Sequence, residues 1–196
     1  MKNNLLLGSG NPGKIKEIKF YLEYFNLFTD RNIIDLSNFS DVGEPEENGS
    51  TFEENSIIKS NFFFKKTNCL TLSDDSGFIV EEMENFPGVK TARVAKEMGG
   101  EQKVVDYIFS KKTKKQKISA TFYCSLSLVG QKINNVVTGK ISGFIIPHKK
   151  GNDGFGYDPF FIPLHSKKTF AEMGDNQKMK LSHRFEAFKI LSTIQK

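Results

Sequence analysis

The sequence has no tryptophan, two cysteines and three histidines among its 196 residues. Cys69 and Cys124 lie far apart in apolar surroundings and lack the paired spacing of a zinc or redox site, so we expect two buried thiols in a reducing compartment. Long apolar runs are absent too. Leu5–Leu7 is too short for the apolar part of a signal peptide, and no stretch approaches the roughly 18 residues of a membrane span. These absences predict a cytoplasmic protein with no membrane partner.

Charge of one sign is only slightly in excess. The chain has 28 Lys and Arg residues against 23 Asp and Glu, a formal net charge of +5, and 38% of its residues are hydrophobic. This composition is ordinary for a folded globular chain and argues against extended disorder. The positive excess favours a polyanionic partner, but nucleotide, nucleic acid and acidic lipid all satisfy it. The length predicts a single domain over residues 1–196.

Hydrophobic periodicity predicts strands that alternate with helices, which is an α/β pattern. The expected strands cover residues 4–7, 33–36, 69–72 and 78–80, and a long hairpin covers 121–146 with its turn at Gly130. The expected helices cover about 13–25, 52–66, 101–110 and 182–194. Thr51 and Glu54 fit a capping box at the start of the second helix, where each side chain would accept from a free backbone amide.

A glycine-rich loop, Gly8-Ser9-Gly10-Asn11-Pro12-Gly13-Lys14, joins the first strand to the first helix and matches two phosphate motifs. A dinucleotide fingerprint would use Asp30 or Asp35 as its acidic residue, and it is weakened by Pro12 and Lys14. A P-loop is excluded by Ile15, which stands where a Ser or Thr hydroxyl would bind magnesium. The physics common to both motifs remains, because a helix N-terminus and a lysine favour phosphate oxygens.

The segment Asp74-Asp75-Ser76-Gly77 follows a short apolar run and places two adjacent carboxylates at a predicted strand end, pointing in different directions. Magnesium prefers a few carboxylates together with substrate phosphates and water, so this pair suits a metal–nucleotide site. A turn with solvated aspartates is the alternative. A second acidic cluster, Glu44, Glu46 and Glu47, lies in the preceding loop.

Other polar segments have both structural and functional interpretations. Asn55 and Lys59 are four residues apart and share one helical face. The segment 155–159 mixes aromatic residues with glycine and proline, as a rigid wall against a flat base would. Ser182-His183-Arg184 opens the last helix, either as a simple N-cap or as a polar group for a ligand. The lysine-rich run 111–117 has no interleaved aromatics, which favours a solvated loop over a nucleic-acid patch.

Five motifs occur in order along the chain: SGNPGK from Ser9, TFEENSIIKS from Thr51, SDDSGFIVEEMENFPGVKTAR from Ser73, GFGYDPFF from Gly154 and KTFAEMGDNQKMKLSHR from Lys168. Together they resemble the inosine triphosphate pyrophosphatase family, and the resemblance spans nearly the whole chain. Some positions depart from the family pattern. Ser56 and Ser60 replace the usual alanines, and Gln177 and Met179 replace the more usual Glu and Asn.

The resemblance implies an α/β fold with an elongated mixed central sheet flanked by helices, and two lobes with an active-site cleft between them. It implies Mg²⁺-dependent hydrolysis of ITP, dITP and XTP to the monophosphate and pyrophosphate by a homodimer. Two other classes stay open: a nucleic-acid-binding module that uses the basic surface, and a Rossmann-type oxidoreductase. The order of preference among the three triphosphates stays open as well.

The resemblance also implies roles for individual residues. Ser9, Gly10, Asn11, Pro12, Gly13 and Lys14 would bind the triphosphate, and Lys59 would contact phosphate. Asp75 would ligate Mg²⁺ and act as the base, with Glu46 as the second metal-side carboxylate, although Glu47 is an alternative to it. The nucleotide site would be lined by Ser76, Phe155, Gly156, Tyr157, Asp158, Lys178, His183 and Arg184. Of these, His183 or Arg184 would donate to the 6-oxo edge of the base.

Overall fold

The computed structural model describes residues 3–111 and 115–195 and confirms a mixed β-sheet flanked by helices. The sheet has the strand order β2-β1-β3-β5-β6-β7, with β4 paired to β3. The strands are β1 (Asn4–Leu7), β2 (Asn32–Asp35), β3 (Leu70–Val80), β4 (Phe86–Pro87), β5 (Ile118–Gly130), β6 (Ile133–Ile145) and β7 (Phe161–Pro163). β1 is parallel to β2 and β3, whereas β4 and β7 are antiparallel to their neighbours.

The chain divides into two compact units. The first unit contains the chain up to Ser76, Cys124–Gly139 and the chain from Arg184 on; the second contains Gly77–Tyr123 and Lys140–His183. The prediction of one domain over residues 1–196 stays a prediction.

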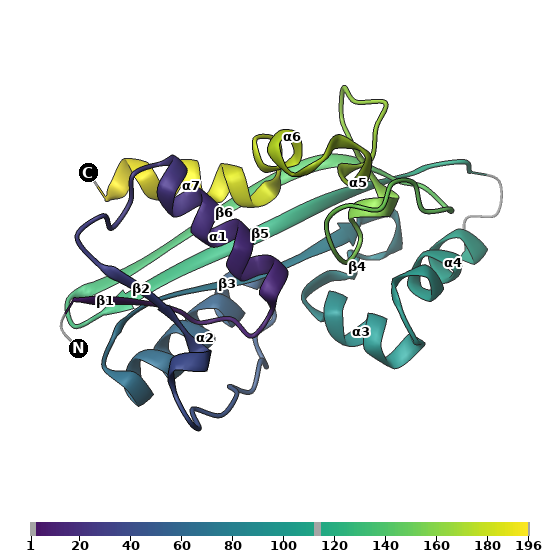
Figure 1. Ribbon diagram of the computed structural model, residues 1–196. Helices are drawn as coiled ribbons and strands as arrows, with labels where there is room; N and C mark the ends of the chain where they lie inside the picture. The colour runs from purple at the N-terminus through teal and green to yellow at the C-terminus, as the bar shows by residue number, and fades with distance from the viewer. Residues whose placement is uncertain (1–2, 112–114, 196) are drawn as a thin grey trace. The chain divides into compact units, whose positions relative to one another are not determined.

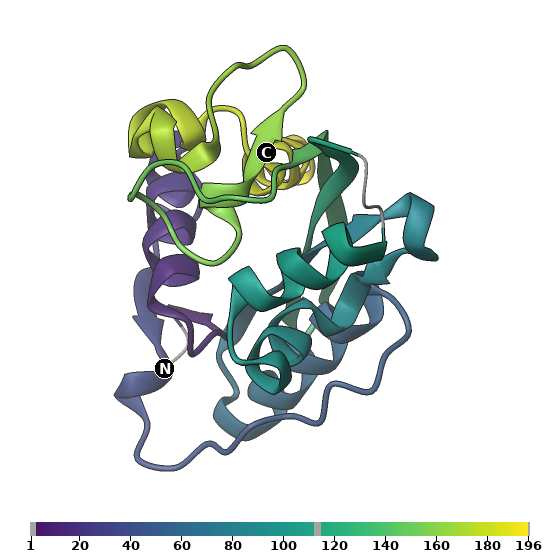
Figure 2. The same cartoon turned by 90° about the vertical axis from the view of Figure 1, so that its right-hand side faces the viewer.

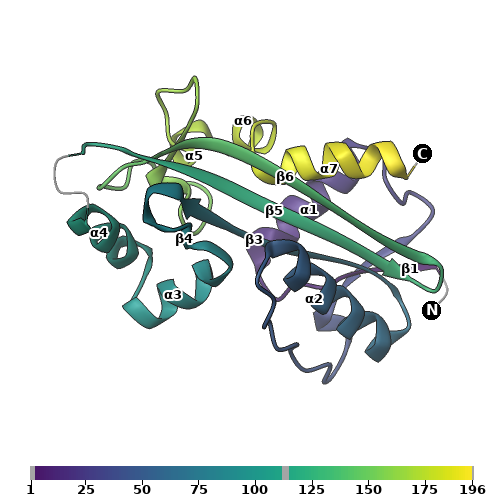
Figure 3. The same cartoon turned by 180° about the vertical axis from the view of Figure 1, so that it is seen from behind.

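In the first unit, helices lie on both faces of the sheet. α1 (Pro12–Tyr24) and α7 (His183–Ile194) lie on one face and α2 (Phe52–Thr67) lies on the other, as opposite views show (Figures 1 and 3). Tyr21 of α1 packs against Phe188 of α7 with ring centroids 5.1 Å apart. On the face of α2, Leu6, Phe63 and Cys69 form a buried apolar cluster. The helix that follows the glycine loop, α1, and the helix that contains Lys59, α2, therefore lie on opposite faces of the same strands.

The start of α2 confirms only half of the predicted capping box. Thr51 Oγ1 accepts from the amide of Glu54 at 3.1 Å, as expected. The Glu54 carboxylate accepts instead from the amide and the hydroxyl of Ser50, at 2.6 and 2.7 Å. A capping box would use only the amide of Thr51, whereas Ser50 offers both an amide and a hydroxyl. The bonds from Ser50 lower the pKa of Glu54.

Strand β3 differs from the prediction because it runs without a break from Leu70 to Val80. The expected strand end at Asp74-Asp75 is therefore wrong: both carboxylates lie in the middle of a strand. The low strand preference of the segment is overridden by tertiary partners, since strand propensity depends strongly on context. Gly77, for example, lies so close to the second-unit helix residue Thr91 that an added Cβ would be 2.4 Å from its Oγ1.

In the second unit, α3 (Thr91–Met98) and α4 (Glu101–Lys111) lie against one another (Figure 2). The core includes Phe122, whose ring centroid is 4.5 Å from that of Phe161. α3, β7 and the short helices α5 (Phe170–Met173) and α6 (Asp175–Met179) were not expected from the sequence. They are at most eight residues long, which is too short for hydrophobic periodicity to reveal them.

Cys69 and Cys124 are both buried free thiols, as predicted. Of the lysine-rich run, residues 112–114 lie outside the described residues. Lys115 forms an ion pair with Glu82 at 2.6 Å, and the Lys117 ammonium lies 4.0 Å from the Phe144 ring centroid. No helix within residues 3–111 or 115–195 is long and apolar enough to cross a membrane.

Candidate active site

Asp74 and Asp75 point to opposite faces of β3, because successive side chains of a strand alternate. The Asp75 carboxylate meets α2: Lys59 Nζ donates to Oδ1 at 2.7 Å, and Asn55 Nδ2 donates to Oδ2 at 3.4 Å. Lys59 also forms an ion pair with Glu47 Oε2 at 3.4 Å. The lysine and its helical neighbour thus fix the carboxylate that the sequence singled out as the base.

The Asp74 carboxylate meets the helices of the other face. Lys14 Nζ lies 3.4 Å from Oδ1, and Arg184 Nη2 donates to Oδ2 at 2.9 Å. Arg184 also donates to Ser76 Oγ at 3.0 Å and to Glu17. Asp74 and Arg184 are almost fully buried, with residue exposures of 1% each. The structure therefore brings the glycine-loop lysine, the aspartate pair and the arginine of the last motif together within the first unit.

The environments drive the pKa values of the two aspartates in opposite directions. Burial alone would raise the pKa of Asp74, but the charges of Lys14, Arg184 and Lys59 outweigh it and hold that pKa well below its usual 3.8. Burial raises the pKa of Asp75 despite the opposing charge of Lys59. Adjacent carboxylates whose pKa values are pushed apart are suited to different tasks: one stays ionised, and the other accepts a proton.

Lys59 stays charged although it is buried. Burial would lower its pKa, but the charges of Asp75, Asp74 and Glu47 outweigh that effect and raise it. Glu46, the carboxylate named from the sequence, is exposed, whereas its neighbour Glu47 is half-buried beside Lys59. The structure therefore favours Glu47 as the loop carboxylate close to Asp75.

The glycine loop places its side chains around the start of α1. Asn11 caps the helix, and its Oδ1 accepts from the amides of Gly13 and Lys14 at 2.9 and 3.2 Å. Ser9 Oγ accepts from the amide of Asn11 at 3.2 Å. The amides that the sequence suggested for phosphate oxygens thus already donate to Asn11, while the Lys14 side chain, at 16% exposure, reaches Asp74.

In the second unit, the polar residues of the last two motifs gather around Asp158. Its Oδ2 accepts from Lys178 Nζ at 2.6 Å and from the amide of Phe155 at 2.8 Å. The Lys178 ammonium lies 4.6 Å from the Phe155 ring centroid. Gly154 has φ +78° and an added Cβ would be 2.2 Å from the Asp158 carboxylate, so the tight turn requires glycine. Lysine, carboxylate and aromatic ring form one preorganised group.

His183 and Tyr157 are both buried in the second unit. The His183 ring stacks on Phe122 with centroids 4.9 Å apart, and Tyr157 packs on Phe78 at 4.5 Å. Burial raises the pKa of Tyr157, so its hydroxyl stays protonated at neutral pH. Of the two aromatic residues of the GFGYDP motif, Tyr157 thus lies in the core, whereas Phe155 is half-buried.

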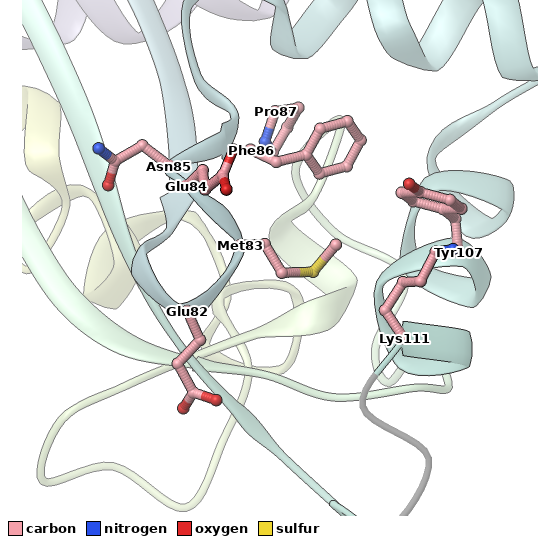
Figure 4. Close-up of a pocket in the computed structure, with 8 residues that line it drawn as sticks. All are labelled: Glu82, Met83, Glu84, Asn85, Phe86, Pro87, Tyr107 and Lys111. Atoms are coloured by element: carbon pink, nitrogen blue, oxygen red, sulfur yellow. The ribbon is translucent and has the colours of Figure 1, made fainter.

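A pocket of about 600 Å³ lies in the second unit. Figure 4 shows residues that line it, among them Phe86 and Tyr107, whose ring centroids are 5.4 Å apart, and Met83. None of the site residues predicted from the sequence is among the residues that line it. The pocket is therefore not part of the candidate site.

The sequence did not predict Glu17 as a site residue, and it placed Asn55 on a helical face without giving it a role. Glu17 is 3% exposed on α1, three residues after Lys14 and next to the buried Ile18. A glutamate on the apolar face of a helix is the signal that could have revealed it, because charges are seldom buried without a partner. Asn55 shares a face with Lys59, as predicted, and the structure gives it a partner in Asp75.

The fold and the site together define an α/β protein with a carboxylate–lysine centre, the kind of site that handles phosphate groups. A model of the Ham1 family matches residues 5–194, and the chain belongs to this family. It is 35% identical over 192 residues to a dITP/XTP pyrophosphatase of Bacillus anthracis, covering 95% of this chain and 93% of the relative. It is 38% identical over 195 residues to one of Clostridium perfringens, covering 95% and 94%.

The solved structure of the Staphylococcus aureus Ham1 protein is similar as well, with a TM-score of 0.82 and 34% identity over 97% of each chain. The resemblance found in the five motifs is confirmed by these matches. The nucleic-acid-binding module and the Rossmann-type oxidoreductase are not supported.

Proposed function

We propose that this protein hydrolyses non-standard purine nucleoside triphosphates, namely ITP, dITP and XTP, to the nucleoside monophosphate and pyrophosphate. The observation that carries this proposal is the buried Asp75 carboxylate, which accepts hydrogen bonds from Lys59 and Asn55. Lys59 also forms an ion pair with Glu47 and so links the two carboxylates. It occurs in a chain that matches relatives named dITP/XTP pyrophosphatase over more than nine-tenths of its length. The enzyme is accordingly a hydrolase of phosphoric anhydride bonds.

The chemistry of the donors fits Mg²⁺. Among the described residues, no three His, Cys, Asp or Glu side chains form a metal-binding group on their own. Mg²⁺ in nucleotide enzymes commonly uses one or two carboxylates, and phosphates and water complete its octahedron. Asp75 and Glu47 would hold it, with Glu46 as the less favoured neighbour. The metal would neutralise charge on the phosphate oxygens.

The protein groups divide the remaining chemistry. The water oxygen bonds to phosphorus, the anhydride bond between the α- and β-phosphates breaks, and Asp75, whose pKa is raised, accepts the proton of the water. Lys59 and Lys14 stabilise the negative charge that develops on the departing pyrophosphate. No covalent enzyme intermediate is needed. Asp74 stays ionised and holds Lys14.

The triphosphate would bind Ser9, Gly10, Asn11, Pro12, Gly13 and Lys14 at the start of α1, where the helix dipole favours anions. Because Asn11 Oδ1 already accepts from two loop amides, its Nδ2 donors and the Ser9 hydroxyl are the uncharged side-chain donors that would face phosphate together with Lys14. The purine base would be recognised by Ser76, Phe155, Gly156, Tyr157, Asp158, Lys178, His183 and Arg184. In that set, Phe155 supplies a ring for stacking, and the Lys178–Asp158 pair supplies a donor and an acceptor.

The proposal is tested by a substrate panel. Purified protein with Mg²⁺ should release pyrophosphate from ITP and XTP far faster than from GTP or ATP, measured by separate pyrophosphate and orthophosphate detection. Asp75→Asn should abolish release, whereas Asp41→Asn, at an exposed carboxylate of the acidic loop, should keep it. Orthophosphate as the product, or equal turnover of ATP, would refute the proposed activity.

We also propose that the protein is a cytoplasmic homodimer. Sedimentation velocity of the purified chain would test the dimer.

A further inference from the structure

Lys59 is a cation that joins the two carboxylates proposed to hold the metal. Its Nζ lies 2.7 Å from Asp75 Oδ1 and 3.4 Å from Glu47 Oε2, and its side chain is 10% exposed. Mg²⁺ binds one or two carboxylates and completes its shell with phosphates and water. The ammonium and the metal would therefore contact the same two carboxylates, and their positive charges would repel one another at short range.

The two carboxylates are held in place by contacts that do not involve the lysine. Asn55 Oδ1 accepts from the amide of Gly49 at 2.8 Å, and Asn55 Nδ2 donates to Asp75 Oδ2 at 3.4 Å. A Cβ added to Gly49 would lie 2.6 Å from Asn55 Oδ1, so the loop backbone lies directly against α2. Gly49 is two residues after Glu47, which limits how far that carboxylate can move. The lysine side chain is therefore the part of the site that can move.

The ammonium of Lys59 needs an anionic partner wherever it lies in this buried site. A lysine has a flexible four-carbon stem, so its charge can change position without a change in the backbone. Leaving the carboxylates for no other anion would be costly, because a buried charge without a partner is strongly destabilising. Phosphate oxygens offer equally strong charge-assisted hydrogen bonds. A bound phosphate group would thus allow the lysine to release the carboxylates to a metal ion.

We infer that Lys59 couples metal binding to phosphate binding: its ammonium competes with the metal for Asp75 and Glu47 until a pyrophosphate group draws it away. The inference rests on the proposed function, which supplies that group as part of the substrate. Such coupling is reciprocal, so the metal strengthens the binding of pyrophosphate by the same factor. The protein accordingly takes up the metal together with the triphosphate and releases it together with the pyrophosphate.

The test compares Mn²⁺ binding by the unaltered protein, Lys59→Met and Lys65→Met, measured by calorimetry with and without imidodiphosphate. This probe is a pyrophosphate analogue with a P–N–P bridge. Free imidodiphosphate also binds Mn²⁺, but to the same extent in every sample, so the proteins are compared with one another under each condition. Lys65 is an exposed lysine of the same helix, and Lys65→Met should match the unaltered protein throughout.

Without the probe, Lys59→Met should bind Mn²⁺ at least about tenfold more tightly than the unaltered protein, because the competing charge is gone. With imidodiphosphate present, this advantage should fall below about threefold, because phosphate has already drawn the lysine from the carboxylates. Equal Mn²⁺ affinities without the probe would overturn the inference, since the lysine would then not compete. An advantage that persists unchanged with the probe would also overturn it, since the lysine would then not respond to phosphate.

Circular dichroism and melting curves establish that each variant is folded. Should Lys59→Met not fold, Lys59→Gln removes the charge but keeps polar hydrogens, and the same two comparisons apply to it. The titrations involve no turnover, so they are independent of the substrate panel. Coupling without pyrophosphate release would refute the proposed activity and support the role of Lys59 in binding. Pyrophosphate release without coupling would overturn this inference alone.

Discussion

Asp74 and Asp75 are neighbours in the chain but belong to different networks: Asp74 accepts from Arg184 at 2.9 Å on one face of β3, and Asp75 accepts from Lys59 at 2.7 Å on the other. The first network fixes the geometry of the strand, and the second holds a carboxylate that is able to take up a proton.

Asp75→Asn should remove activity, and in the presence of EDTA its effect on the free energy of unfolding should change with pH. Burial raises the pKa of Asp75 above its usual 3.8, so the folded state binds this proton more tightly than the unfolded state. The stability linked to that proton is present below pH 3.8 and is lost as the pH rises through the folded pKa. Urea unfolding at pH 7 and near pH 4 should show that the stability of the variant relative to the unaltered protein falls toward acid. A difference in stability that is the same at both pH values would contradict this.

Asp74→Asn should change stability with the opposite dependence on pH. The pKa of Asp74 is held well below 3.8, so its contribution is present above pH 3.8 and is lost as the pH falls through the folded pKa. Because the substitution leaves Arg184 and Lys14 without their shared carboxylate, we expect a loss of about 3–5 kcal/mol at pH 7. Urea unfolding gives the value. Unfolding unchanged by the substitution would show that the buried pair contributes nothing.

Lys59→Met should bind divalent metal more tightly in the absence of nucleotide. The ammonium lies 2.7 Å from Asp75 and 3.4 Å from Glu47, where its charge repels a second cation and engages the same carboxylates. Calorimetric titration with Mn²⁺ should show the gain, and pyrophosphate release should fall because a phosphate contact is lost. Lys65→Met, on the exposed end of the same helix, serves as the matched control. Metal binding weakened by Lys59→Met would place the metal elsewhere.

The buried hydroxyl pair between α2 and β5 should show strong coupling. Ser60 Oγ and Ser127 Oγ are 2.6 Å apart, and both residues are fully buried. Either serine changed to alanine leaves one hydroxyl without this partner, at a cost of about 1–2 kcal/mol, whereas the double variant should lose less than the sum. Urea unfolding of the four proteins measures the coupling, and ITP hydrolysis should stay unchanged. Additive losses would mean that the two hydroxyls do not interact.

The sequence predicted the elements whose signals are local. The periodicity of Ile18 and Leu22 gave α1, and the long alternation around Cys124 and Leu126 gave β5. The course of β3 through Asp74 and Asp75 could not be predicted, because polar residues favour a turn until distant partners hold them in a strand. The motifs assigned Lys59 and Asp75 to one active site. They did not predict Glu17, whose partner Arg184 lies 167 residues further along the chain.

The uninterrupted course of β3 makes its residue count a constraint. Its register against β1 pairs Leu7 with Leu72, two residues before Asp74. Adding or deleting one residue after Leu72 would reverse every side chain that follows, because the period of a strand is two. Asp75 would then face Arg184, and its neighbour would face Lys59. The different roles of the two aspartates therefore depend on whether each occupies an odd or an even position of the strand. Insertions or deletions in this stretch are tolerated only when they add or remove an even number of residues.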